Sequence, residues 1–449
     1  MSAISCRARI IDAITSSAVQ TIFDIKPEGD SWLNSDVKLV LGTVITGADL
    51  TTRYNDRCGG FGLIRQLTVR DQVGRTLFDL QEVGRYATFA LLRQANEDSL
   101  EFSHLTGENG AMKITNEDLS QVDAAGMKGK LSRSVIRTAY YRSGESPAQV
   151  LANPLPPSYT LGKYWEDPIR PTTDPTTTPM MLLDLRKICD LIDGRLLPLG
   201  KMGTLRFIIT WENTITRIYS GSESLPDLAA GSLPWVPPTA FYVYQPQLVY
   251  NMISGIAPGP EKISIVYESP RLSVNQISDV AINLGNGIRT DNQQIGFAGQ
   301  LVNRLLIDVR TDVGVYDAVL GSSYGLNFKV NGSQVYPQRL SEGSILNQLQ
   351  QTFGQLMIPA GAYGNSGYPV SSGCWQYMTS DWIGVDLKPV KTSGKSTDPT
   401  NTCRIDSSGI SMELQRRYGN GGIPVRQLYT WAFNPRVISI GPMGVMDVQ

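Results

Sequence analysis

The sequence LRFIITWE at residues 205–212 has the alternating apolar and polar pattern of a β-strand. It lies inside a longer β-type stretch that begins with LLDL at 182–185 and closes with FYVYQP at 241–246, after a loop rich in Gly, Pro and Ser. Near the C-terminus the same order returns in three segments, which are WIGVDL (382–387), GISMEL (409–414) and LYTWAFNP (428–435). The chain is therefore predicted to contain one β unit twice.

The first half also contains a pattern of strand, turn and helix. Strands are expected at 37–45 and 63–70, after a leading strand or arm within residues 10–25. Thr76-Leu77-Phe78-Asp79 has the spacing of a helix capping box. Apolar residues then recur at helical spacing, namely Leu80, Val83, Ala87, Ala90 and Leu91. These features predict a helix of about four turns that ends near Asn96.

The second half repeats this pattern. Residues 326–330 are strand-like, and Asn331-Gly332 is the dipeptide that best supports a tight hairpin, because both central positions need a positive φ. Between Ser341 and Phe353 an apolar stripe has helical spacing (Ile345, Leu346, Leu349 and Phe353). Strand, turn and helix are thus predicted in both halves.

The two copies differ in length at one place. Val69 and Val330 lie 261 positions apart, whereas Gly203 and Gly409 lie only 206 positions apart. The first copy therefore carries about 55 extra residues between its helix and its later strands. They fall in residues 97–180, where we expect long inserted surface loops.

Length and composition favour two all-β domains. A chain of 449 residues exceeds the size at which one core keeps growing. We expect residues 1–257 to form an N-terminal arm and a first jelly roll that carries the inserted loops, and residues 258–449 to form a second jelly roll. Each half has roughly eight predicted strands. Because alternating amphipathic helices are missing, a parallel α/β fold is disfavoured.

The charge, the cysteines and the N-terminus exclude several classes of protein. A net charge of −1 gives no overall basic field for nucleic acid. The five cysteines form no Cys-x-x-Cys pair, which predicts free thiols in a reducing compartment. Arg7, Arg9 and Asp12 interrupt the N-terminal segment, so we expect no signal peptide and synthesis in the cytosol.

Some residue groups could carry chemistry, but a structural role is favoured for each. They are the single His104, Cys374-Trp375, the Asp184, Asp190 and Asp193 group around Cys189, and the basic clusters Lys128 to Arg137 and Arg416-Arg417. Nothing beside His104 completes a catalytic constellation. The aspartates lack the dense spacing of a calcium loop and are interpreted as turn and cap residues. The sequence therefore predicts no catalytic, cofactor-binding or metal-binding residues.

Several of these segments resemble a known family. The strand, turn and helix of residues 63–92, Leu197-Pro198-Leu199 before its strand, and residues 331–337 resemble the double jelly-roll major capsid proteins of double-stranded DNA viruses. This lineage includes adenoviruses, tectiviruses, virophages and polinton-like viruses. The Tyr, Pro and Leu pattern at residues 244–248 is also similar. The resemblance covers most of the chain as an arrangement of segments, not as an invariant signature.

The resemblance implies a structural protein of the virion and not an enzyme. Three chains with two barrels each would form a pseudo-hexameric capsomer, and such capsomers would tile an icosahedral shell. The implied partners are two further copies, neighbouring capsomers, and penton and minor capsid proteins. A host receptor at the outer loops, and an internal membrane or genome at the inner face, are further candidates. The Arg7-Ala8-Arg9 arm is a candidate for such inward contacts, with a solvated tail as the alternative.

Two other functions stay open at this point. One is an assembly scaffold of the same fold. The other is a carbohydrate-active or glycan-binding β-sandwich protein, which as an enzyme would need a pair of carboxylates in a cleft lined by aromatic side chains.

Overall fold

The computed structural model describes thirteen parts of the chain, which are residues 4–47, 52–55, 58–94, 171–220, 236–256, 262–276, 288–309, 321–354, 382–391, 395, 398–418, 427–441 and 444–448. The chain divides into two compact units: Met1–Met112 with Ser146–Ser269 and Arg436–Gln449, and Lys113–Glu145 with Pro270–Pro435. The division falls inside two long strands, β12 (Ile263–Gln276) and β22 (Gln427–Gly441). The predicted domain bounds of 1–257 and 258–449 stay a prediction.

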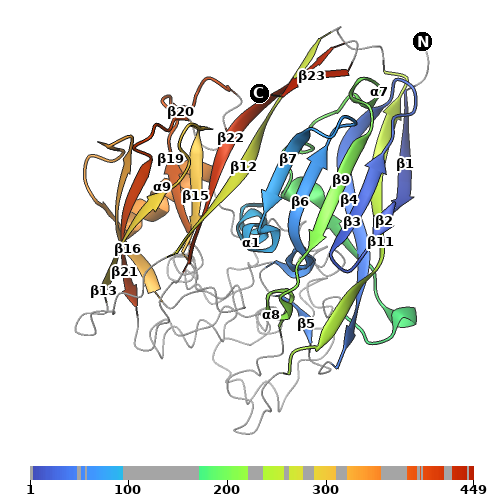
Figure 1. Cartoon of the computed structure of the whole chain (residues 1–449), viewed down its shortest axis with the longest axis horizontal. Helices are drawn as coiled ribbons and strands as arrows, with labels where there is room; N and C mark the ends of the chain where they lie inside the picture. The colour runs from blue at the N-terminus through green and yellow to red at the C-terminus, as the bar shows by residue number, and fades with distance from the viewer. Residues whose placement is uncertain are drawn as a thin grey trace, which may run out of the picture. The chain divides into compact units, whose positions relative to one another are not determined.

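The first unit contains two antiparallel sheets (Figure 1). One has the order β1-β11-β4-β8, formed by Ser5–Asp12, Ala240–Ser254, Trp32–Thr46 and Met181–Asp184. The other has the order β2-β3-β9-β6-β7, formed by Thr15–Ser16, Gln20–Ile25, Leu205–Trp211, Ile64–Arg70 and Thr76–Gln81. A short pair joins β5 (Arg53–Tyr54) to β10 (Tyr219–Ser220).

The remaining strands, most of which belong to the second unit, repeat this arrangement. One sheet has the order β12-β22-β15-β19, in which β15 is Arg304–Asp308 and β19 is Trp382–Asp386. The other has the order β13-β21-β16-β17, formed by Ile288–Ile295, Ile410–Tyr418, Gly321–Val330 and Ser333–Gln334, with β18 (Leu340–Ser341) also on β16. The short strands β14 (Leu301–Val302) and β20 (Cys403–Arg404) pair with each other, and β23 (Gly444–Val448) pairs with the end of β22.

The principal strands have the same order in both units. In chain order, β1, β3, β4, β6, β7, β8, β9 and β11 correspond to β12, β13, β15, β16, β17, β19, β21 and β22. In each unit the first, eighth, third and sixth of these strands form one sheet, and the second, seventh, fourth and fifth form the other. Two such four-stranded sheets make a jelly roll. The predicted fold of two tandem jelly rolls is confirmed.

Among the described residues, each jelly roll has one longer helix between its fifth and sixth strands, as predicted. These are α1 (Val83–Gln94) and α9 (Glu342–Phe353). The other described helices are single turns: η1 (Gly59–Leu63), η4 (Pro175–Thr177), η5 (Leu185–Lys187), α7 (Leu199–Met202) and α8 (Ile215–Ile218).

The predicted capping box at Thr76 to Asp79 is wrong. Residues 76–81 form β7, which pairs with β6 and buries Leu77, Phe78 and Leu80. The carboxylate of Asp79 accepts hydrogen bonds from Gln66 Nε2 and Thr68 Oγ1 at 2.7 and 2.8 Å instead of capping a helix. The helix begins only after Glu82, whose φ of 55° turns the chain out of the strand.

The length difference between the two copies lies where the sequence predicts it. Residues 95–180 separate α1 from β8, whereas residues 354–381 separate α9 from β19. Residues 95–170, which include most of the predicted inserted loops, lie outside the described part of the chain.

Each unit has its own apolar core between its two sheets. In the first unit, residues that are completely buried include Phe23, Leu39, Phe78, Leu183 and Phe207. In the second unit, the core includes Leu305, Ile307, Phe328, Ile383 and Leu428. At roughly 25 cal/mol per Å² of apolar surface, burial of these side chains is the main stabilising contribution to each jelly roll.

The predicted Asn331-Gly332 hairpin is confirmed, because the two residues have φ values of 52° and 75° and join β16 to β17. The Asn331 amide also donates to the Arg404 carbonyl at 2.8 Å and accepts from the Asp406 backbone at 2.9 Å. We expect Asn331→Ala to lower the free energy of unfolding by about 1 to 3 kcal/mol, since it strains φ and removes both bonds. Urea unfolding of Asn331→Gly, which loses the same two bonds without straining φ, should show a smaller loss; equal losses would contradict the contribution of φ strain.

Candidate functional site

The aspartates around Cys189 have structural roles in the first unit. Asp184 caps η5 and binds the Arg186 guanidinium through both of its oxygens. Asp190 accepts the backbone N–H of Glu268 at 2.7 Å. Burial raises the pKa of the Cys189 thiol well above its usual range, so this thiol is not poised as a nucleophile. The interpretation of Asp184 as a cap residue is confirmed.

Other groups from the sequence lie outside the described residues. They are His104, Cys374-Trp375 and the basic cluster Lys128 to Arg137, and for Arg416-Arg417 the structure describes the backbone but not the side chains. Their interpretation stays a prediction. Within the described ranges, no group of three or more His, Cys, Asp or Glu residues is placed to hold a metal ion. None of the described helices has both the length and the apolar character that a membrane span requires.

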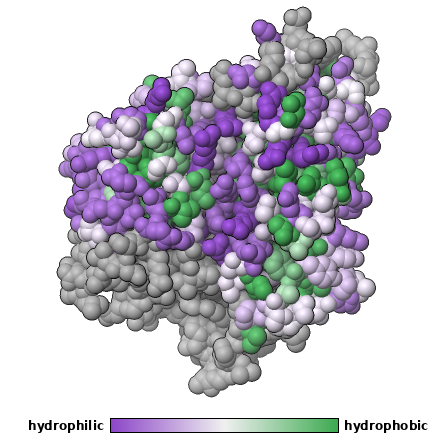
Figure 2. Space-filling model, viewed as in Figure 1, coloured by the Kyte–Doolittle hydropathy of each residue, from purple (hydrophilic) through white to green (hydrophobic). Residues whose placement is uncertain are grey.

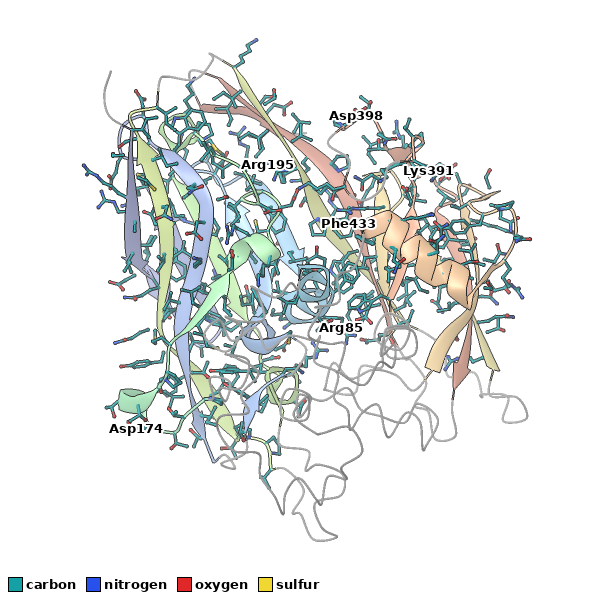
Figure 3. The ribbon with its side chains drawn as sticks, turned by 180° about the vertical axis from the view of Figure 1, so that it is seen from behind. Arg85, Asp174, Arg195, Lys391, Asp398 and Phe433 are labelled. Atoms are coloured by element: carbon teal, nitrogen blue, oxygen red, sulfur yellow. The ribbon has the colours of Figure 1, made fainter. Side chains whose placement is uncertain are left out.

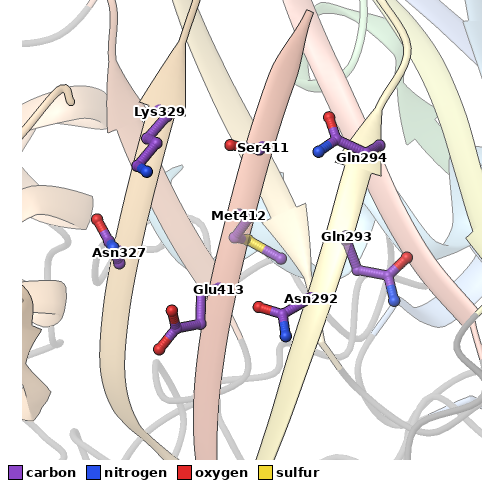
Figure 4. Close-up of a pocket in the computed structure, with 8 residues that line it drawn as sticks. All are labelled: Asn292, Gln293, Gln294, Asn327, Lys329, Ser411, Met412 and Glu413. Atoms are coloured by element: carbon purple, nitrogen blue, oxygen red, sulfur yellow. The ribbon is translucent and has the colours of Figure 1, made fainter. Parts of the chain in front are cut away.

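An open groove of about 240 Å³ lies on the outer face of the β13-β21-β16 sheet (Figure 4). Two rows of cross-strand neighbours line it, which are Gln294-Ser411-Lys329 and Asn292-Glu413-Asn327. Its lining has no aromatic ring and a single carboxylate, that of Glu413, which pairs with Arg339. The groove therefore lacks the two carboxylates that glycoside hydrolysis uses.

The β1-β11-β4-β8 sheet (Figure 3) has exposed apolar residues on its outer face. Ile4 and Ile10 are 71% and 65% exposed. Cys6 and Ala8, which lie between them at every second position and therefore on the same face, are also exposed. The register continues this surface across the sheet to half-buried side chains, which are Ile253 and Trp32 beside Cys6, and Val249 beside Ile10. We call this surface, made by Ile4, Cys6, Ala8, Ile10, Trp32, Val249 and Ile253, the β1 face.

The predicted N-terminal arm is part of this sheet. Arg7-Ala8-Arg9 lies inside β1, which pairs with β11 along its whole length. Arg9 Nη2 forms an ion pair with Glu28 at 2.5 Å. The alternative of a solvated tail is therefore wrong for residues 5–12, because a sheet ladder holds their backbone.

The opposite sheet of the first unit also has apolar residues on its outer side. Ile22 and Ile208 are cross-strand neighbours on β3 and β9 and are half-buried, and Ile14 close by is 59% exposed. Figure 2 shows apolar side chains over these strands among hydrophilic ones. The first unit thus has apolar residues on two flat flanks.

In the second unit, the sheet that corresponds to the β1 face is buried on its outer side. Leu306, Trp382 and Trp431 are at most 2% exposed there. Helix α9 covers part of this side, since the guanidinium carbon of Arg304 lies 4.7 Å from the centre of the Phe353 ring and 4.8 Å from that of Phe433. Such cation–π contacts let a charged side chain pack inside an apolar layer.

Buried tyrosines predict a loss of stability at alkaline pH. Burial raises the pKa of Tyr267 to about 12, and it also raises the pKa values of Tyr54, Tyr219 and Tyr336. Between about pH 10 and pH 12 the unfolded phenol ionises while the folded one stays neutral, so each such group lowers the free energy of unfolding by about 1.4 kcal/mol per pH unit. Urea titrations at about pH 9 and pH 11 should show this decrease, with a smaller slope for Tyr267→Phe. An unchanged slope would contradict the prediction.

Comparison with solved structures shows the same fold over nearly the whole chain. The Sputnik virophage structure matches 99% of this chain and 88% of its own, with a TM-score of 0.60 and 14% identity. The PBCV-1 virus capsid model matches 100% and 98%, with a TM-score of 0.52 and 11% identity. The mavirus major capsid protein matches 98% and 90%, with a TM-score of 0.52 and 13% identity. No protein-family model and no curated protein sequence matches the chain.

Proposed function

We propose that this chain is the major capsid protein of an icosahedral DNA virus. Three copies form a capsomer in which six jelly rolls surround a common axis, and capsomers pack edge to edge into the shell. The observation that carries this proposal is the repetition of one eight-strand order in both units of a chain that matches capsid proteins over nearly its full length.

The physical chemistry of the chain suits this role. Two linked barrels let a threefold assembly present six similar sides, and closed symmetry uses the same interfaces repeatedly. The first unit has flat flanks with exposed isoleucines, including Ile10 and Ile14, and such patches mark interaction surfaces. A net charge of −1 lets many copies pack together without strong repulsion.

The proposal assigns the protein a mechanical role and no catalytic one. Its groove has one paired carboxylate, and its buried tyrosines and thiols lie in the cores. Besides its own copies, the proposed partners are neighbouring capsomers and the penton and minor capsid proteins. The virion is the proposed location, and an internal membrane or genome is a further candidate at the inner face.

Native mass spectrometry of the purified chain tests the proposal. We expect a trimer of about 148 kDa, which is three times the 49.2 kDa of one chain. Electron microscopy of particles from cells that express the protein with its viral partners should then show pseudo-hexameric blocks. A chain that stays monomeric at all concentrations would overturn the proposal.

A further inference from the structure

The first unit also contains segments that lie outside the eight principal strands of its jelly roll. Residues 263–269 of β12 belong to it, and so do residues 436–449, which contain the end of β22 and β23. Both β12 and β23 pair with β22, so the described residues of these segments form one ribbon (Figure 1). We call residues 263–269, 436–441 and 444–448 the closing ribbon.

Two strands of the closing ribbon bury alternating apolar residues. In β12 these are Ile265 and Tyr267, and in β22 they are Ile438 and Ile440, which are completely buried. Residues two apart in a strand point to the same side, so each strand turns one apolar row away from solvent. Removal of these side chains from water stabilises the ribbon on the first unit.

The closing ribbon binds the edge of the β2-β3-β9-β6-β7 sheet. Strand β7 is the last strand of this sheet, and among the described strands it pairs only with β6. Leu77 is the extra residue of a bulge in that pairing, and the ladder leaves such a residue unpaired. The phenol of Tyr267 donates to the Leu77 carbonyl, and Arg436 Nη1 donates to the Thr76 carbonyl at 3.2 Å. Side chains from both ribbon strands therefore bind the backbone of this edge strand.

The ribbon is held at a second place, the segment between β8 and β9. The backbone N–H of Glu268 donates to Asp190 Oδ2 at 2.7 Å, and Asp190 also lies 3.6 Å from Arg195 Nη2. Helix α7 of the same segment contacts β23. The ribbon thus joins β7 to the β8–β9 connection of the first jelly roll.

The ribbon is made later in synthesis than the strands that it closes. The principal strands of the first jelly roll end at Ser254, whereas Arg436 lies 360 positions after Thr76. Contacts between residues so far apart form slowly, because closing the intervening loop costs conformational entropy. Until they form, the β7 edge has no cover from the ribbon, and free edges promote aggregation.

We propose that the β7 edge of the first jelly roll closes only when residues 436–441 have been made and have packed against it. The first jelly roll then depends on a segment that follows nearly the whole second jelly roll in the sequence. A chain that lacks this segment does not complete its first jelly roll. The inference goes beyond the proposed function and does not rest on it, since it concerns the folding of a single chain.

Hydrogen exchange of the full chain, measured by mass spectrometry of peptides, tests this dependence in the native state. Ile438→Ala truncates a buried side chain of the ribbon, and the matched control Leu428→Ala truncates a buried one in the part of β22 that belongs to the second unit. We expect Ile438→Ala to speed exchange of residues 76–81 at least about tenfold. Leu428→Ala should speed exchange of residues 304–308, which pair beside it, and leave residues 76–81 within about twofold of the wild type. An equal effect of both variants on residues 76–81, or no effect of Ile438→Ala there, would overturn the inference.

Pulse-labelling hydrogen exchange during refolding from urea tests the order of events without a substitution. We expect residues 76–81 to gain protection in the same kinetic phase as residues 436–441 and not earlier. Earlier protection of residues 76–81 would show that the edge closes without the ribbon, and the inference would be overturned. Neither measurement requires a trimer, so these results and the test of the proposed function are independent.

Discussion

Trp431→Ala is expected to lower the free energy of unfolding by about 3 to 5 kcal/mol. Trp431 lies in β22 and is completely buried. Its ring centre is 6.2 Å from that of Trp382 and 6.4 Å from that of Tyr429, with which it is stacked. Truncation removes a large apolar surface and leaves a cavity between two aromatic rings that cannot collapse onto each other without moving their strands.

The control for this prediction is Tyr242→Ala in the corresponding strand β11. Tyr242 is 45% exposed, so its truncation should cost less than about 1 kcal/mol. Trp431→Phe should fall between the two, because it keeps an aromatic ring in the layer. Urea unfolding of the three variants measures the order. Equal losses for Trp431→Ala and Tyr242→Ala would show that the aromatic layer does not stabilise the second unit.

These two aromatic residues show what the sequence can predict about this fold. Alternation correctly predicts the strand at 205–212, since a half-buried strand repeats every two residues. The strand at 428–435 is also predicted correctly, although residues 428–434 are buried on both faces of the sheet. Both residues are aromatic and lie in strand-like segments, and the sequence cannot tell that one is buried and the other exposed. That difference depends on whether other parts of the fold cover the outer face of the sheet, and the local sequence of the strand does not determine this.

The helix start illustrates a second limit. Leu80 fits both the alternation of a strand and the apolar stripe of the following helix, so the pattern alone extends the helix back to Thr76. The pairing of Phe78 with Val69 decides for a strand. Asn331-Gly332 is predicted correctly because its requirement for positive φ is local.

The β1 face could not be predicted from the sequence. The segment from Ile4 to Asp12 has the composition of an arm, and the sequence does not state that it pairs with residues 247–254, more than 230 positions away. Only this pairing places Ile10 beside Val249 and Cys6 beside Ile253 on one surface. A surface of this kind forms only when distant strands pair in one register, and the sequence does not give that pairing. A catalytic motif, in contrast, can be searched for in the sequence itself.

Gly384→Ala is expected to destabilise the second unit by about 1 to 3 kcal/mol, although it adds a single methyl group. A Cβ at this position of β19 would lie 2.8 Å from the Cα atom of Leu349 in helix α9, and 3.1 Å from Thr352 Cβ. Because the closest atom belongs to the backbone, a change of rotamer cannot relieve the contact. The helix would have to move away from the sheet, and its contact between Phe353 and Arg304 would loosen.

The matched control is Gly296→Ala in the same unit, where an added Cβ has no neighbour within 4 Å. This variant should be neutral or more stable by up to about 1 kcal/mol, because alanine restricts the unfolded chain. Thermal and urea unfolding of both variants measure the difference. Adding Leu349→Ala to Gly384→Ala should not restore stability, since it removes side-chain atoms and leaves the obstructing Cα in place. Restored stability in the double variant would show that the Leu349 side chain, and not the helix backbone, sets the distance between α9 and β19.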